Sequence, residues 1–229
     1  MSMSTQDWFA VRLSLQVAIT AVIISLPSAV LIGYILAKRR FRGKWLIQNL
    51  VDLPLVLPPV VTGYMLLVCF GPYGPVGSFL AHTFHFRIAF NWLGAALASA
   101  VVSYPLMVRS IRSAFSSVDS KLEFASESLG INKFKTFLQI SLPLASNGIL
   151  AGCLLAFARS IGEFGATIMI AGDIPDQTRT IPLAIYSLAN TIGGIKSGWP
   201  LVLMAISLSS ISLICGEILE RRGWRNDNS

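Results

Sequence analysis

The amino-acid sequence predicts an all-α integral membrane protein with about five membrane-spanning helices. Of its 229 residues, 54% are hydrophobic and only 13% are charged, whereas soluble domains carry about 25% charged residues. The mean hydropathy of +0.67 likewise indicates a membrane protein. The apolar residues are grouped in long runs, and the basic residues that give the net charge of +7 lie mostly in short segments beside those runs. This placement indicates membrane topology and gives no basic and aromatic platform for nucleic acid.

The first apolar run, at about 11–37, is long enough to cross a bilayer, for which about 20 residues are needed. Five basic residues follow between Lys38 and Lys44. Because basic loops remain in the cytoplasm, this run predicts a first span with an external N-terminus and a cytoplasmic loop after it.

The second span is expected at 45–70, and its helix is expected to be interrupted. Asp52 and three prolines, including Pro58 and Pro59, lie within it. Irregular backbone at membrane depth is tolerated where protein or a water-filled cavity covers it. The run LPLVLPPVVTGY, with the hydroxyl of Thr62, is therefore a candidate for lining a translocation path, although a proline kink packed between helices explains the same residues.

A third span at 91–115 contains Ser103, a further candidate for the path, and ends near basic residues. A fourth span is expected at 143–171, where small residues recur every four positions at Gly148, Gly152, Ala156 and Ser160. Such a stripe permits close contact between helices.

The fourth span also contains Arg159 and Glu163, which are four residues apart and therefore neighbours on one helical face. Charges at this depth are costly, so the two side chains are expected to face a partner or a cavity. Either they neutralise each other within the helix bundle, or Arg159 presents positive charge to a passing anion while Glu163 holds it in place.

The segment at 180–196 is marginal as a span, because its apolar run is short and contains Asn190 and two glycines. A sixth crossing there would leave the basic C-terminus outside, so we predict that the segment lies in the outer interface. The fifth span at 199–219 then returns to the cytoplasm, where Arg221, Arg222 and Arg225 satisfy the positive-inside rule. The whole chain, 1–229, is expected to form a single transmembrane domain with a cytoplasmic C-terminus.

The polar segment at 116–142 separates the third and fourth spans. Ser120 and Glu123 have the spacing of a capping box at a helix start. Gly130 favours the left-handed backbone that ends a helix, and a second short helix is expected from Asn132 until just before Pro143. The prediction is a cytoplasmic helix, a glycine turn and a second helix.

This segment resembles the EAA loop of the membrane subunits of bacterial ABC importers. The matching positions are Glu123, Ala125, Ser126, Gly130, Ile140, Leu142 and Pro143, and Leu129, on the same helical face as Ala125 and Ser126, is counted with them as a coupling residue. Phe124 stands where the common form has its glutamate, and the acid lies one residue earlier, which resembles the oxyanion-transporting branch. A peripheral amphipathic hairpin on the membrane surface is the alternative explanation of the segment.

The resemblance extends to RSIGEFGAT and IPDQTRTIPLAIY, which are similar to the molybdate-type permeases. It implies a type I ABC importer transmembrane domain in the bacterial inner membrane. It further implies a homodimer that works with two copies of a cytoplasmic ATP-binding subunit and with a periplasmic oxyanion-binding protein. The residues at 123–143 would then couple to the ATPase, and the expected substrate is molybdate or tungstate.

The sequence itself predicts no enzyme and no cofactor. It contains no GxxxxGK[ST] pattern, so a partner must hydrolyse ATP. His82 and His85 lack a third ligand and do not predict a metal site. A sulfate or thiosulfate permease of the same family stays an alternative, and an autonomous channel or secondary transporter is a more distant one.

Overall fold

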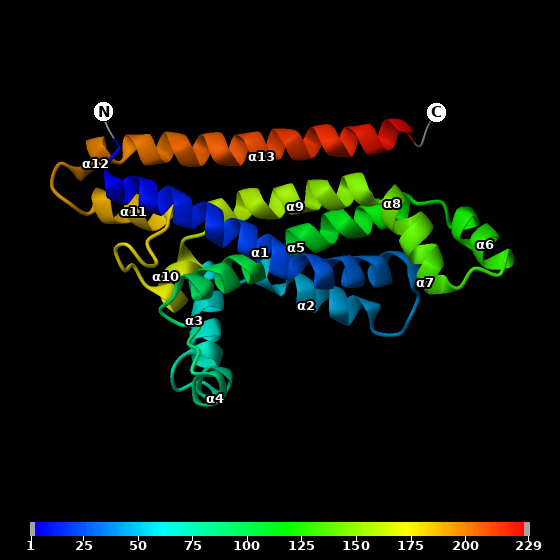
Figure 1. Ribbon diagram of the computed structural model, residues 1–229, viewed down its shortest axis with the longest axis horizontal. Helices are drawn as coiled ribbons and strands as arrows, with labels where there is room; N and C mark the ends of the chain where they lie inside the picture. Colours follow the sequence, from blue (N-terminus) through cyan, green and yellow to red (C-terminus); the bar gives the residue numbers. More distant parts are fainter. Residues whose placement is uncertain (1–2, 227–229) are drawn as a thin grey trace.

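The computed structural model describes residues 3–226, and side chains as far as residue 219. This part of the chain is helical throughout, with turns and no strand (Figure 1). The helices are α1 (Thr5–Lys38), α2 (Lys44–Val56), α3 (Pro59–Phe70), α4 (Pro75–Phe84), α5 (Trp92–Ser117), α6 (Ser120–Ser128), α7 (Lys133–Thr136), the π-helical η1 (Phe137–Ser141), α8 (Leu142–Leu144), α9 (Ser146–Ile161), α10 (Gly165–Ala171), α11 (Ile181–Ala189), α12 (Gly194–Ser197) and α13 (Trp199–Asn226).

The long helices α1, α5, α9 and α13 lie side by side along the long axis of the molecule (Figure 1). The short helices α6 and α7 form one end of this bundle, while the N-terminus, α11 and α12 form the other. Three helices of the described residues are long and apolar enough to cross a membrane, and up to five spans result if each of two bent helix pairs counts as one. The all-helical fold class is thus confirmed, and the division into five crossings at the predicted bounds stays a prediction.

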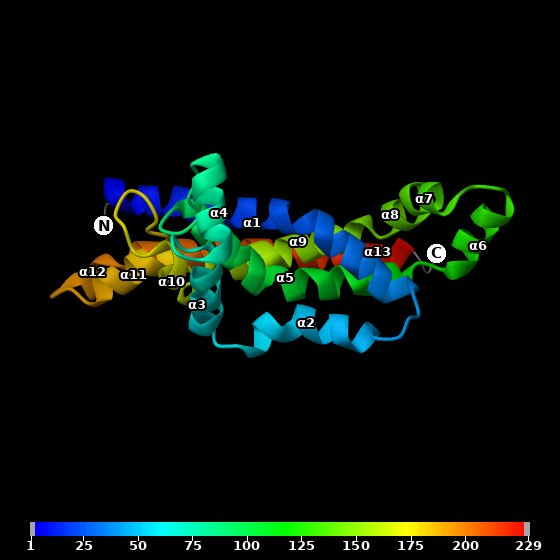
Figure 2. The same ribbon diagram turned by 90° about the horizontal axis from the view of Figure 1, so that it is seen from below.

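The bend predicted at the prolines of the second segment is present. Helix α2 ends at Val56, and α3 begins at Pro59 at an angle of 110° to it. Pro58 is the N-cap residue of α3, and Pro59 is its first residue, where the missing N–H of proline costs no hydrogen bond. As a result α3 and α4 run across the bundle instead of along it (Figure 2).

Helix α9 packs closely on α5 through its small residues. A β-carbon added at Gly148 would collide with Ala114, and one added at Gly152 would press on Ser110. The stripe predicted from the sequence therefore faces another helix, as expected for a close helix contact. Beyond Ile161 the chain breaks before α10, so the segment predicted at 143–171 contains three helices, α8, α9 and α10.

The segment at 180–196 contains α11 and α12. With nine residues, α11 is about 13 Å long and cannot cross a hydrocarbon core of about 30 Å. It buries Ile181 and Ala184 against Ala10 and Val11 of α1 and Leu201 of α13. Arg221, Arg222 and Arg225, on which the orientation prediction depends, lie outside the described side chains.

Candidate functional site

The segment at 116–142 forms the helix, turn and helix that its sequence predicts. Gly130 has a φ of +83°, in the left-handed region. The Asn132 side chain accepts a hydrogen bond of 2.8 Å from the backbone N–H of Lys135 at the start of α7. Between the two helices, the hydroxyl groups of Ser126 and Thr136 form a buried hydrogen bond of 3.0 Å. The turn is therefore stabilised by hydrogen bonds within the segment itself.

The capping box predicted for Ser120 and Glu123 is wrong. Asp119, one residue earlier, caps α6 by accepting a hydrogen bond of 2.9 Å from the backbone N–H of Lys121. Ser120 is already the first residue of the helix. The Glu123 side chain is thereby released from the cap and is available to other elements.

Glu123 instead connects three parts of the chain. Its Oε2 lies 3.1 Å from the Nζ of Lys38, the last residue of α1. Its Oε1 accepts a hydrogen bond of 2.6 Å from the hydroxyl of Ser141, at the end of η1. Lys38 also donates a hydrogen bond of 2.6 Å to the carbonyl of Val118, between α5 and α6. We refer to Lys38, Glu123, Ser141 and the Val118 carbonyl as the Lys38 bracket.

An aromatic cluster supports the same junction. Tyr34 of α1 packs edge to face on Phe115 of α5 and on Phe137 of η1, with ring centroids 5.2 and 4.8 Å apart. Phe115 is fully buried. Such edge-to-face pairs are the favoured arrangement of aromatic rings.

The second short helix does not stop before Pro143, contrary to the prediction. The chain continues from α7 through the π-helical η1 into α8, and Pro143 lies in the first turn of α8. Proline is tolerated there because a first-turn residue needs no N–H donor. A bend of 67° follows α8, before α9 begins.

The remaining predicted coupling residues divide between an exposed face and an inner face. Ala125, Leu129, Gly130 and Pro143 are exposed, whereas Ile140 and Leu142 are partly buried and Ser126 is buried. Leu129 is 82% exposed, and large apolar neighbours are exposed with it. We define the coupling surface as Leu122, Phe124, Leu129, Phe134 and Leu138, all exposed on α6, the turn, α7 and η1. Exposed apolar side chains gathered at one end of a protein indicate a protein contact.

At the other predicted site, Arg159 and Glu163 form an ion pair of 2.8 Å between Nη1 and Oε2. The Glu163 side chain is only 2% exposed, and that of Arg159 is 32% exposed. The Oε1 of Glu163 accepts a hydrogen bond of 2.9 Å from the backbone N–H of Ala166, in the first turn of α10. The predicted pairing is confirmed, and Glu163 additionally holds the chain where α9 ends and α10 begins.

The other predicted path residues lie on separate elements. Pro59 is close to Gly165, so that the start of α3 packs against the start of α10. Thr62 is buried, and its hydroxyl has no hydrogen-bond partner among the described residues. Ser103 is also buried, but its hydroxyl donates a hydrogen bond of 2.7 Å to the Ser99 carbonyl within α5. The hydroxyl of Thr62 is thus unused within the described residues, whereas that of Ser103 is engaged in its own helix.

Sequence reasoning missed two features of this region. Thr167 on α10 is as buried as Thr62, and its hydroxyl likewise has no partner in the described part of the chain. Asp52 of α2 and Arg109 of α5 form two close contacts of 2.9 Å. Their separation in sequence gives no local signal, since neither residue lies within a helical turn of the other.

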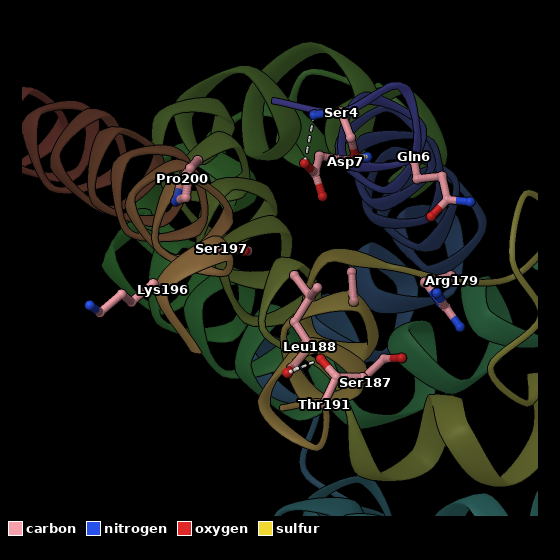
Figure 3. A pocket seen from close by; sticks show the side chains of 11 residues that line it. Ser4, Gln6, Asp7, Arg179, Ser187, Leu188, Thr191, Lys196, Ser197 and Pro200 are labelled. Carbon is pink, nitrogen blue, oxygen red and sulfur yellow. Dashed lines mark hydrogen bonds between the residues drawn. The ribbon is translucent and has the colours of Figure 1, made fainter. Parts of the chain in front are cut away.

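A groove of about 620 Å³ lies at the end of the bundle opposite to α6 (Figures 1 and 3). Its charged residues are largely compensated within the chain. Asp7 and Ser4 satisfy each other's backbone N–H groups in a capping box at the start of α1. Arg179 pairs with Asp173 at 2.6 Å, and Lys196 points away from the groove.

The comparisons with known proteins agree on one family. Residues 29–225 match the model of the family described as binding-protein-dependent transport system inner membrane component. The chain is 48% identical, over 96% of its length and 96% of the relative's, to the molybdenum transport system permease protein ModB of Escherichia coli (strain K12). It is 37% identical to the sulfate transport system permease protein CysT of Salmonella typhimurium (strain LT2), over 77% of this chain and 64% of that protein. A bacterial ABC transporter that imports alginate has the same fold, with a TM-score of 0.69, 16% identity and coverage of 96% of this chain and 80% of that one.

Proposed function

Because the chain belongs to the family of binding-protein-dependent transport system inner membrane components, we propose that it is the membrane-spanning permease subunit of an ATP-driven importer, translocating molybdate or tungstate. The observation that carries this proposal is the match along nearly the full length to a molybdenum permease. The sulfate permease matches less of the chain at lower identity, which favours molybdate over sulfate or thiosulfate.

The coupling surface is the part of the chain that we assign to an ATP-binding partner. It presents apolar side chains on helices too polar overall to lie within the bilayer, including Phe124, Leu129 and Phe134. The chain has no phosphate-binding motif of its own. We therefore assign ATP hydrolysis to two copies of a cytoplasmic subunit, each docked on one permease of a homodimer. A periplasmic oxyanion-binding protein would deliver the substrate at the opposite end.

Transport requires that the ATPase contacts differ between an inward-open and an outward-open state, because a ligand shifts an equilibrium only by its differential affinity. The coupling segment lies between α5 and α9, and both helices run along the bundle. A displacement of α6 by the ATPase would therefore be transmitted to both α5 and α9. At membrane depth, the proposed lining of the path consists of Pro58, Pro59, Thr62 and Ser103. Arg159 and Glu163 stay candidates for it, beside their role as a structural ion pair.

The proposed orientation places the N-terminus outside and the coupling segment inside. The basic run from Lys38 to Lys44 supports it through the positive-inside rule. A topology reporter fused at Ser229 should therefore behave as cytoplasmic, and one inserted near Gly172 as external. An external Ser229 would require the segment at 180–196 to cross the bilayer.

The substrate is tested by uptake of labelled molybdate and labelled sulfate in a deletion strain that carries this gene. Molybdate uptake that sulfate does not compete away is the expected result. Preferential sulfate uptake would support the sulfate permease instead. Uptake that persists without the ATP-binding subunit would support a channel or secondary transporter.

The docking surface is tested by Leu129→Asp, which places a charge on its most exposed side chain. We expect the ATP-binding subunit to dissociate during co-purification. Ser128→Asp is the matched control, because it adds the same charge one residue earlier, at an exposed position outside the surface. If both variants retain the ATPase, the coupling surface is assigned wrongly.

A further inference from the structure

We propose that Lys38 is a positioning residue of the coupling machinery, which fastens the membrane helix α1 directly to the coupling segment. The inference rests on the proposed function and extends it to a residue outside the EAA-like loop. Lys38 is distinguished from its neighbours by its burial, since its side chain is 10% exposed whereas Arg39 and Arg40 are exposed. A lysine at the end of a membrane helix ordinarily extends its charged group into water.

The contacts of Lys38 identify what it holds. Its Nζ lies between the Oε2 of Glu123 at 3.1 Å and the Val118 carbonyl at 2.6 Å. Val118 immediately precedes the residue that caps α6, so one contact fixes the entry to the helix and the other fixes its first turn. Glu123 continues the connection to Ser141 at 2.6 Å. One ammonium group thereby joins α1, the α5 to α6 connection, α6 and η1.

The position of Ser141 gives the bracket a mechanical role. Ser141 ends a π-helical turn, which in many proteins marks a functional site, and the chain bends by 67° a few residues later as it enters α9. The bracket is therefore located where the motion of α6 must pass into the bundle. Because the charged groups are mostly shielded from water, their attraction is stronger than that of a surface ion pair.

The consequence is a second route of coupling. Among the described residues, Lys38 makes the direct ion pair between α1 and α6; without it, α6 reaches the bundle through the chain at α5 and through its contacts with α7 and η1. With it, a displacement of α6 also acts on α1, which packs along α5 and α9. Lys38 then strengthens the communication of ATP hydrolysis to the bundle, and the ATPase docks without it.

The test uses the complete transporter, with the ATP-binding subunit and the binding protein, reconstituted in lipid vesicles. Lys38→Met removes the charge at a similar chain length, and Lys38→Arg retains it. Arg40→Met is the matched control, because it removes one exposed positive charge from the same basic run. We expect Lys38→Met to keep the ATPase bound while the molybdate imported per ATP hydrolysed falls by about tenfold. Lys38→Arg should recover much of this ratio.

A second measurement needs neither partner. Limited trypsin digestion of the purified permease measures how readily the coupling segment unfolds locally. The cleavage sites are Lys121, Lys133 and Lys135, which are exposed. Cleavage there should be faster in Lys38→Met than in Arg40→Met. The exchanged pair Lys38→Glu with Glu123→Lys should slow cleavage after Lys133 and Lys135 again, because the attraction is restored. Only these two sites are compared, since Glu123→Lys itself adds a trypsin site.

The outcomes separate the two proposals. A Lys38→Met protein that couples and resists trypsin as Arg40→Met does overturns the role of Lys38, whatever Leu129→Asp shows. Loss of the ATPase itself in Lys38→Met overturns it also, since the residue would then act on docking. If Leu129→Asp retains the ATPase while Lys38→Met loosens the segment, the bracket stands and the proposed docking surface fails.

Discussion

Glu123 and Glu163 are both largely enclosed carboxylates, and each binds one cationic side chain and one further donor. They differ in what they connect. Glu163 pairs with Arg159 one helical turn before it and accepts the N–H of Ala166 three residues after it. Glu123 pairs with Lys38 on α1 and accepts the hydroxyl of Ser141 in η1.

This difference assigns the two carboxylates to different tasks. The Glu163 pair is local, because it stabilises only the break in the chain between α9 and α10. The Glu123 pair joins α1, α6 and η1, which are far apart in the sequence. Glu163 is also the more deeply buried, with a side chain 2% exposed against 15% for Glu123. Disrupting the first should mainly reduce stability, and disrupting the second should mainly reduce communication.

The largest effect is expected when one member of the Arg159 and Glu163 pair is removed. Arg159→Met leaves the buried carboxylate of Glu163 unpaired, which costs about 3–5 kcal/mol for a buried pair, and Glu163→Gln costs less because Arg159 is 32% exposed. The double variant leaves no unpaired charge and should assemble. The yield and thermal unfolding of the purified protein measure this.

Molybdate uptake by the double variant then separates the two explanations of the pair. We expect near wild-type uptake, because a strong fixed charge in the path would hold a dianion too tightly to release it. A double variant that assembles but transports poorly would instead mean that Arg159 presents its charge to the substrate.

Glu123→Gln should cost less stability than Glu163→Gln, about 2 kcal/mol, because the amide can still accept a hydrogen bond and the site is closer to water. Glu123→Gln should nevertheless lower the amount of molybdate imported per ATP hydrolysed more than Glu163→Gln does. Glu127→Gln is the control, as it removes an exposed charge from the same helix. Equal coupling in Glu123→Gln and Glu127→Gln would remove the distinction between the two carboxylates.

The same comparison explains which features the sequence could predict. Arg159 and Glu163 are four residues apart, so helical periodicity alone places them together. Gly130 and Asn132 belong to turn and cap patterns that act over three or four residues. In each case the partner lies within the same short window, and the structure agrees with the prediction.

Glu123 shows where such reasoning ends. Its spacing from Ser120 satisfies the capping-box pattern, yet Asp119 is an equally good cap one residue earlier and takes that position. The actual partners, Lys38 and Ser141, come from other elements, and no local pattern specifies them. The Asp52 and Arg109 pair was missed for the same reason.

Ser126→Ala should destabilise the coupling segment by about 1–2 kcal/mol, because it leaves the buried hydroxyl of Thr136 without its partner. The combined Ser126→Ala and Thr136→Val variant removes both polar groups and should be closer to wild type. Hydrogen exchange of α6 and α7 measures the loss. If the amides of α6 and α7 exchange as slowly in Ser126→Ala as in the combined variant, another group accepts or donates the hydrogen bond of Thr136.

The smallest stability effect is expected at Gly130, where the backbone alone is affected. A β-carbon at this position would meet no atom within 4 Å, so Gly130→Val introduces no collision with neighbouring residues. The φ of +83° is nevertheless unfavourable for a β-branched residue and should cost about 1 kcal/mol. Because this strain acts on the turn between α6 and α7, it should tilt the coupling surface and leave the bundle, where the Glu163 pair lies, unchanged.

Gly130→Asn is the matched control, since asparagine tolerates the left-handed conformation. We expect Gly130→Val to insert into the membrane normally, to bind the ATPase more weakly and to transport more slowly, while Gly130→Asn stays close to wild type. Co-purification of the ATPase and molybdate uptake measure these effects. If Gly130→Val and Gly130→Asn are equally active, the angle between the two short helices does not matter for docking. The connection from the coupling segment to the bundle would then depend on the Lys38 bracket and on the chain at α5 and α9, and not on the shape of the turn.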